Sequence, residues 1–196
     1  TKAAFEPVLD YVVVKIPRFT FEKFPTAEKI LGTQMKSVGE VMAIGRTFKE
    51  ALQKAVRSLE EGHPGLAGAL DGKLDLDQLR QFLMVPGPQR LFWIYQALKV
   101  GQSVEEIHRL TYITPWFIQE IEEIVIVEGR LRGYPANFIP QDLMEQVKRA
   151  GFSDQQIARF TGGSEEEVKE LRHHYGIHPA FKRVDTCAGE FVAETP

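Results

Sequence analysis

The chain has 196 residues, enough for one medium domain or for one domain plus part of another. Hydrophobic residues make up 43% of it, a globular value that argues against wholesale disorder. The net charge of −3 argues against a general binder of polyanions such as nucleic acids, and no apolar run reaches the roughly 18 residues of a membrane span. Cys187 is the only cysteine, which excludes an intramolecular disulfide and is compatible with a cytoplasmic location.

The two ends of the sequence predict that it is a piece of a larger protein. It opens on Thr1 rather than on a methionine, only a few residues before a run typical of a strand. It closes on Pro196 without an obvious stop. We therefore expect further chain on both sides.

The first 47 residues predict two strands separated by an aromatic loop. Residues 11–16 are rich in β-branched side chains, and the predicted strand stops at Pro17. Residues 37–45 form a second candidate strand, with Gly39 and Gly45 as residues that commonly interrupt strands. Two strands with so little helix cannot bury a sheet face alone. This segment is expected to need a partner, either preceding chain or another subunit.

From Thr47 onwards the hydrophobic period becomes helical. Thr47 and Glu50 fit a capping box, and apolar side chains follow at helical spacing until Gly62. Residues 63–73 are rich in glycine and predict a loop or linker. Further helices are expected at 76–84, 89–100, from Ser103, at 116–129 as the longest helix, at 139–149, and from Ser153 and Ser164.

The last two of these helices resemble a DNA-binding helix-turn-helix in their spacing. They lie within residues 151–176 and are joined by Thr161-Gly-Gly163. The second helix, however, begins with glutamates at 165–167, where base readout needs cations and amides. These carboxylates fit better as groups that stabilise the helix N-terminus through its dipole. A DNA-binding regulator is therefore kept only as the alternative function.

No pattern in the sequence predicts a catalytic, cofactor-binding or metal site. His173 and His174 are neighbours on a helix and point about 100° apart, and His178 follows the helix end, so these histidines are expected to be structural or exposed. Adjacent acids such as Glu122 and Glu123 diverge in the same way, which disfavours paired acid–base catalysis. Glycine-rich phosphate cradles are absent.

Three stretches together resemble one protein family in order and spacing. They are Phe5-Glu-Pro-Val-Leu-Asp-Tyr-Val-Val-Val-Lys-Ile-Pro-Arg-Phe19, Gln34-Met-Lys-Ser-Val-Gly-Glu-Val-Met-Ala-Ile-Gly-Arg-Thr47 and His178-Pro-Ala-Phe-Lys-Arg-Val-Asp-Thr-Cys-Ala188. They resemble the middle of the large chain of carbamoyl-phosphate synthase. The resemblance runs through the whole chain and is looser between about Gly62 and Gln156.

The resemblance implies a mainly α fold with three parts. Residues 1–47 would be the C-terminal, β-containing remnant of the first ATP-grasp unit, which forms carboxyphosphate. Residues 48–180 would be a helical oligomerisation domain. Residues 181–196 would be a linker into the second unit, which forms carbamoyl phosphate.

The resemblance also implies an activity for the parent enzyme. It would be an ATP-dependent carbon–nitrogen ligase that makes carbamoyl phosphate from bicarbonate, glutamine-derived ammonia and two ATP, with Mg²⁺ (or Mn²⁺) and K⁺, for arginine and pyrimidine synthesis. The ligands of ATP and metal in that family fall outside these residues, so this fragment is expected to be inactive and to bind no cofactor. Its expected partners are the rest of the large chain, the glutaminase small chain and further copies of itself, with no nucleic acid and no membrane.

One residue role is implied by the same resemblance. Glu40 matches a glutamate that lines the internal route of carbamate between the two units. The alternative is a buried glutamate paired with an arginine of the missing sheet, and the sequence leaves both open.

Overall fold

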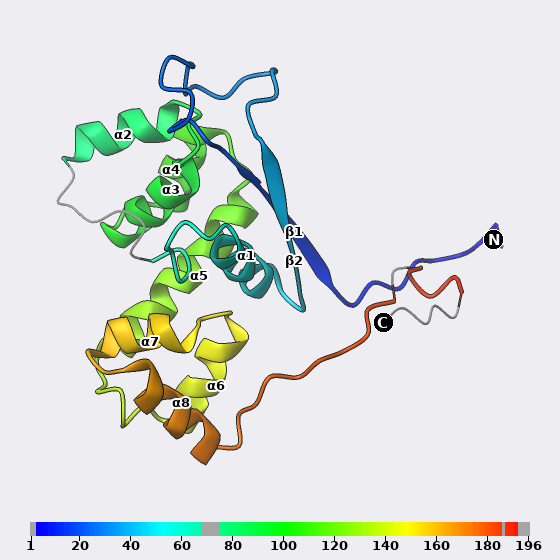
Figure 1. The fold of residues 1–196 in the computed structure, drawn as a ribbon, viewed down its shortest axis with the longest axis vertical. Helices are drawn as coiled ribbons and strands as arrows, with labels where there is room; N and C mark the ends of the chain where they lie inside the picture. The colour runs from blue at the N-terminus through cyan, green and yellow to red at the C-terminus, as the bar shows by residue number, and fades with distance from the viewer. Residues whose placement is uncertain (1–2, 68–74, 186, 192–196) are drawn as a thin grey trace.

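The computed structural model describes residues 3–67, 75–185 and 187–191, and in these residues the protein is mainly helical, as expected (Figure 1). Two strands precede eight helices. The elements are β1 (Val12–Arg18), β2 (Gly39–Gly45), α1 (Phe48–Ser58), α2 (Leu76–Met84), α3 (Arg90–Lys99), α4 (Val104–Thr111), α5 (Pro115–Leu131), α6 (Gln141–Arg149), α7 (Asp154–Thr161) and α8 (Glu165–His174). Of the loop expected at 63–73, residues 63–67 lie outside helices and strands, and 68–73 are outside the described residues.

Strands β1 and β2 form an antiparallel hairpin in which Val12 lies opposite Gly45 and Arg18 opposite Gly39. The prediction that the first strand stops at Pro17 is wrong, since β1 continues through it to Arg18. Each strand of a two-stranded sheet has one open side, where a proline without an N–H group removes no ladder hydrogen bond. Side chains alternate along β1, so that one face packs on α1 and the other is exposed.

Helix α1 begins where the capping residues predicted it. The Thr47 hydroxyl accepts a hydrogen bond from the Glu50 N–H at 3.2 Å, but the Glu50 carboxylate accepts from the backbone N–H of Arg46 instead of closing the box on Thr47. The prediction that Gly62 ends the helix is wrong. The helix ends at Ser58, and a tight turn with Glu60 at a positive φ of 55° follows.

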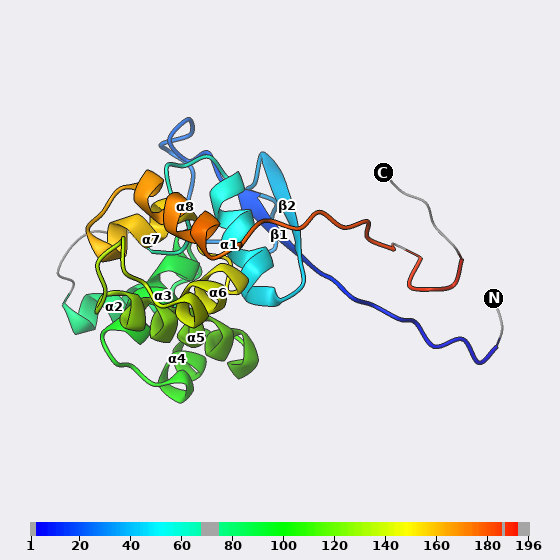
Figure 2. The same ribbon diagram turned by 90° about the horizontal axis from the view of Figure 1, so that it is seen from below.

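The longest helix, α5, runs between two groups of shorter helices (Figures 1 and 2). Helices α2, α3 and α4 contact one another at one end, where α3 and α4 pack on α5, while α6 and α7 pack on α5 at the other end and α8 on α7. Ile118, Ile121 and Ile124 of α5 are buried, whereas Phe117 is 41% exposed. None of the helices in the described ranges is long and apolar enough to cross a bilayer.

Two helix starts repeat the same local structure. Gly101 and Gly151 have φ values of 88° and 87°, and a serine two residues later accepts a hydrogen bond from the third N–H of the next helix. At Ser153 the box is complete, since the Gln156 side chain accepts from the Ser153 N–H in return. Residues 101–103 and 151–153 therefore form the same turn, before α4 and before α7.

The turn between α6 and α7 is fixed against α1. A Cβ placed on Gly151 would lie 2.8 Å from the Cα of Glu50, so only glycine allows the two backbones to come this close. Beside this contact, the buried amide of Gln53 donates to the Ala150 carbonyl at 3.0 Å and accepts from Gln156 at 2.8 Å. Helix α1 is thus held to α7 and to the turn before it by satisfied buried polar groups.

The first and last described segments extend to the same side of the helices, and in Figure 1 the last segment rises from α8 to meet the first (Figures 1 and 2). The Val8 N–H donates to the Ala188 carbonyl at 2.7 Å. The Asp185 carboxylate accepts from the N–H groups of Cys187 and Gly189 and shapes the turn that brings Ala188 there. The predicted domain boundaries after residues 47 and 180 stay predictions.

Candidate functional site

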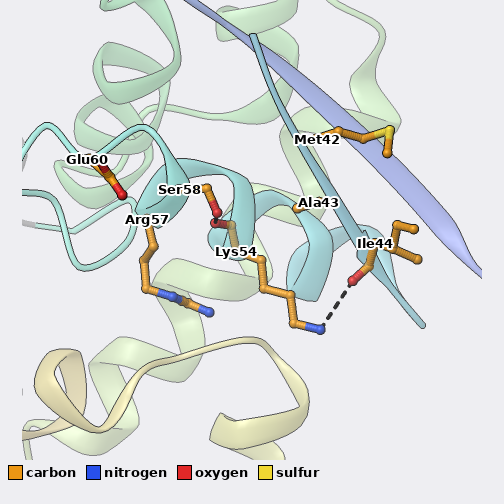
Figure 3. Close-up of a pocket in the computed structure, with 7 residues that line it drawn as sticks. All are labelled: Met42, Ala43, Ile44, Lys54, Arg57, Ser58 and Glu60. Carbon is orange, nitrogen blue, oxygen red and sulfur yellow. Dashed lines mark hydrogen bonds between the residues drawn. The ribbon is translucent and has the colours of Figure 1, made fainter. Parts of the chain in front are cut away.

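A pocket of about 380 Å³ lies where the end of β2 meets α1 (Figure 3). Its walls combine an apolar strand end with the polar C-terminal half of the helix. The lining residues are Met42, Ala43, Ile44, Lys54, Arg57, Ser58 and Glu60. In Figure 3 the Lys54 and Arg57 side chains extend to the same side of α1.

Lys54 ties the helix to the strand. Its ammonium pairs with the Glu50 carboxylate at 2.5 Å and donates to the Ile44 carbonyl at 3.2 Å. The pKa of Glu50 is lowered, because hydrogen bonds from Lys54 and Arg46 outweigh the burial that would raise it. The Lys54 charge is therefore largely committed within the protein.

Arg57 is held differently. One nitrogen donates to the Gly151 carbonyl at 2.7 Å, a contact that depends on the close approach of Gly151 to α1. Burial lowers the pKa of its guanidinium, and the charge of Glu50 only partly opposes this. In the described part of the chain no carboxylate forms an ion pair with Arg57. Lys54 and Arg57 were not predicted as site residues, although their i, i+3 spacing on a helix places them on one face.

Glu40, the residue implied to line a passage, lies on the outer face of the hairpin. Its carboxylate pairs with the Lys15 ammonium at 2.8 Å, and both side chains are more than half exposed. The two roles considered for Glu40, lining a passage or pairing with an arginine of the missing sheet, both require contacts with residues outside this chain. Its role stays a prediction.

A groove of about 1000 Å³ separates the loop after β1 from α2 and α3. Stacked ring pairs form part of its walls, among them Phe19 with Phe21 and Phe82 with Trp93. Arg18 and Glu61 both line the groove and form an ion pair at 3.0 Å. The Arg18 guanidinium also donates to the Leu59 carbonyl at 2.8 Å, so its charge is satisfied internally.

The side chains of His173, His174 and His178 are exposed, as expected. The rings of His173 and His178 are 5.1 Å apart between centroids, because the turn at Gly176 brings the chain back beside α8. His174 stacks instead on Tyr175. Among the described residues, no three or more histidine, cysteine, aspartate or glutamate side chains lie close enough together to hold a metal ion.

The two helices considered for DNA binding are α7 and α8, which pack on each other. The carboxylate of Glu167 closes a complete capping box on Ser164, and Glu166 pairs with Lys169 at 3.3 Å. These glutamates therefore serve the helix start, as the dipole argument expected. The end of α8 that would face a groove of DNA is acidic, which gives no support to the alternative.

Comparison with known proteins places the chain in a family. The sequence model described as "Carbamoyl-phosphate synthetase large chain, oligomerisation domain" matches residues 40–176. Over its whole length the chain is 55% identical to the N-terminal section of the carbamoyl phosphate synthase large chain of Aquifex aeolicus, 49% to the large chain of Archaeoglobus fulgidus and 52% to the chloroplastic arginine-specific large chain of Oryza sativa. It spans 35%, 19% and 17% of those three proteins. The chain belongs to the carbamoyl phosphate synthase large chain family and contains its oligomerisation domain.

Proposed function

We propose that this chain is the central scaffold section of a carbamoyl phosphate synthase large chain. The match of residues 40–176 to the oligomerisation domain carries the proposal. Packed helices joined by buried polar contacts suit the task of holding two catalytic units in fixed register better than a flexible linker would. The exposed apolar face of the hairpin, with Val13, Met42 and Ile44, would then pack against preceding chain of the same protein.

The parent enzyme would be an ATP-dependent carbon–nitrogen ligase that forms carbamoyl phosphate from bicarbonate, glutamine-derived ammonia and two ATP, with Mg²⁺ (or Mn²⁺) and K⁺. It would work in the cytoplasm with a glutaminase small chain. The names of the relatives support the synthase itself, and the arginine-specific relatives support a role in arginine synthesis. Residues 1–196 alone are expected to be inactive. Measurable ATP hydrolysis or carbamoyl phosphate formation by this chain would contradict the scaffold role.

Self-association would use the exposed face of α2. This helix buries only Leu79 and Leu83, while Leu76 and Met84 are more than half exposed. Light scattering should show a mass that rises with concentration, and Leu76→Glu should return the chain to a monomer. Val100→Glu, at an equally exposed apolar site after α3, is the matched control and should leave the mass unchanged. A wild-type chain that stays monomeric at all concentrations would contradict the proposed self-association.

For Glu40 we propose the passage role, supported by its place on the outer face of the hairpin beside Lys15. In a complete large chain, Glu40→Gln should slow synthesis of carbamoyl phosphate while bicarbonate-dependent ATP hydrolysis continues. Lys15→Gln removes the other half of the ion pair and serves as a comparison. Equal loss of both reactions in Glu40→Gln would favour a buried structural glutamate instead.

A further inference from the structure

We propose that His173 and His178 together chelate a late first-row divalent metal ion, such as Zn²⁺ or Cu²⁺, at the C-terminal end of α8. The site lies within this chain and does not depend on the proposed scaffold role. It rests on the spacing of the two imidazole rings, on the rigid turn that joins them and on the polarity of the helix end. The bound ion would tie the start of the last described segment to α8.

The spacing of the two rings fits a shared ion. The centroids of the His173 and His178 rings are 5.1 Å apart, and the ring planes are tilted by 46°. An ion about 2.1 Å from one nitrogen of each ring lies about 3 Å from each ring centre, so a tetrahedral angle at the ion places the two centres about 5 Å apart. Both side chains are exposed and can rotate to turn one nitrogen each towards the ion. The backbone therefore already has the separation that a chelate needs.

The turn after α8 holds the two histidines at this spacing. On a continuous helix, side chains five residues apart would point about 140° apart. Here Gly176 has a φ of 68°, and the N–H groups of Gly176 and Ile177 donate to the carbonyls of His173 and Arg172 at 2.9 and 3.0 Å. These two hydrogen bonds are those of a Schellman turn, which fixes the direction of the chain after the helix.

Side-chain contacts fix the same turn from below. Arg172 is only 9% exposed, and its guanidinium donates to the Ile177 carbonyl at 2.7 Å and pairs with Asp154 at 3.1 Å. The Tyr175 hydroxyl donates to the Ile139 carbonyl at 2.9 Å. The residues beside both histidines are thus attached to the helical core. Little conformational entropy is lost when an ion binds, because only the two imidazole side chains have to be ordered.

The charge and the ligand type at this end of α8 decide which ion fits. The helix C-terminus carries the negative end of the dipole, which favours a cation, and the nearby charge of Arg172 is paired with Asp154. Imidazole nitrogens suit Zn²⁺, Cu²⁺ and Ni²⁺, whereas Mg²⁺ prefers oxygen ligands. Within the described residues no third histidine, cysteine, aspartate or glutamate joins the pair. Water therefore completes the coordination, and the ion binds more weakly than at a zinc site with four protein ligands.

Isothermal calorimetry with Zn²⁺, Cu²⁺ and Mg²⁺ tests the site, in a chain without a histidine tag and with Cys187→Ser to remove the only thiol. We expect one saturable site that binds Cu²⁺ more tightly than Zn²⁺ and from which Mg²⁺ does not displace Zn²⁺. His173→Gln and His178→Gln should each weaken binding by about tenfold or more, because a single imidazole cannot chelate. His174→Gln is the matched control, since this histidine stacks on Tyr175 instead and its loss should leave the affinity unchanged.

Electron spin echo spectra of the Cu²⁺ complex count the bound imidazoles and separate this pair from a lone surface histidine. We expect two imidazoles in the unsubstituted chain and at most one in His173→Gln and His178→Gln. All three histidines are exposed, so the variants should fold, and their circular dichroism should match that of the wild type. A single bound imidazole in the unsubstituted chain would overturn the proposal. Wild-type affinity in His173→Gln, or an equal loss of affinity in His174→Gln, would overturn it as well.

Discussion

Gly101 and Gly151 have nearly the same backbone conformation and differ in what stands beside them. A Cβ on Gly101 would meet nothing within 4 Å, whereas on Gly151 it would meet the Glu50 backbone at 2.8 Å. Gly101→Ala should therefore cost only the strain of a positive φ, about 1–3 kcal/mol. Gly151→Ala should cost clearly more, because α1 must also move. Urea unfolding of the two variants measures the difference, and equal losses would contradict the close approach.

The stability of the protein should depend on pH through Asp154. Burial opposes ionisation of this carboxyl, but hydrogen bonds and charge from Lys148 and Arg172 outweigh it and lower its pKa. A carboxyl with a lowered pKa in the folded state contributes stability that is complete above about pH 4, the ordinary aspartate value, and is lost as the pH falls below it. The free energy of unfolding should thus fall more steeply between pH 5 and pH 2.5 in the wild type than in Asp154→Asn.

The exposed carboxyl of Asp142 on α6 provides the control for this pH series. Asp142→Asn should follow the wild-type profile. Since Glu50 also has a lowered pKa, some acid sensitivity should remain in Asp154→Asn. A profile of Asp154→Asn parallel to that of the wild type would show that the contacts with Lys148 and Arg172 do not matter for folding.

Among the helices, capping strength should separate α8 from α4. Ser164 takes part in a reciprocal box with Glu167, whereas Ser103 accepts from Glu106 but receives no side chain in return, because the Glu106 carboxylate binds Arg109. Ser164→Ala removes the acceptor of the Glu167 N–H and the hydroxyl that donates to the Glu167 carboxylate, at a cost of about 1 kcal/mol. Ser103→Ala should cost less. Thermal unfolding followed by circular dichroism would test the order of the two variants.

Most helices could be predicted from the sequence because their start signals are local. Ser103, Ser153 and Ser164 cap helices through bonds that span three residues, so tertiary packing was not needed to find them. Helix ends were less predictable. Helix α1 ends at Ser58, before Gly62. The turn that follows has its positive φ at Glu60, a residue type that does not mark a helix end in the sequence.

The pocket could not be predicted, although both of its cations were visible in the sequence. The spacing of Lys54 and Arg57 places them on one face of a helix. The spacing does not predict that this face lies against the end of β2. Nor does it predict that the Gly151 carbonyl, nearly a hundred residues away, accepts a hydrogen bond from Arg57. Such pairings are set by tertiary contacts, which local periodicity does not encode.

For the molecule as a whole, stability should be lowest in the hairpin. β1 and β2 form an isolated pair with one exposed face, while Tyr95 of α3 and Ile118 of α5 are fully buried in the helical core. Backbone amides of the hairpin should exchange with solvent much faster than those of α3 and α5 in this chain. Hydrogen exchange measured by mass spectrometry would test this. Equal protection in a monomer would mean that the hairpin needs no partner.

The two end segments of the chain should be joinable without disturbing the helices. A Cβ on Gly189 would lie 3.7 Å from the Cβ of Val8, within the roughly 3.5–4.5 Å found across disulfides. In a Cys187→Ser background, Val8→Cys with Gly189→Cys should oxidise readily and raise the melting temperature, because closing almost the entire chain into one loop stabilises it by more than the strain of a cysteine at the positive φ of 81° at Gly189. Leu9→Cys with Gly189→Cys is the comparison, because neighbouring side chains of an extended segment point to opposite sides. If the two cysteine pairs oxidise at the same slow rate, the first and last described segments do not lie beside each other at Val8 and Gly189.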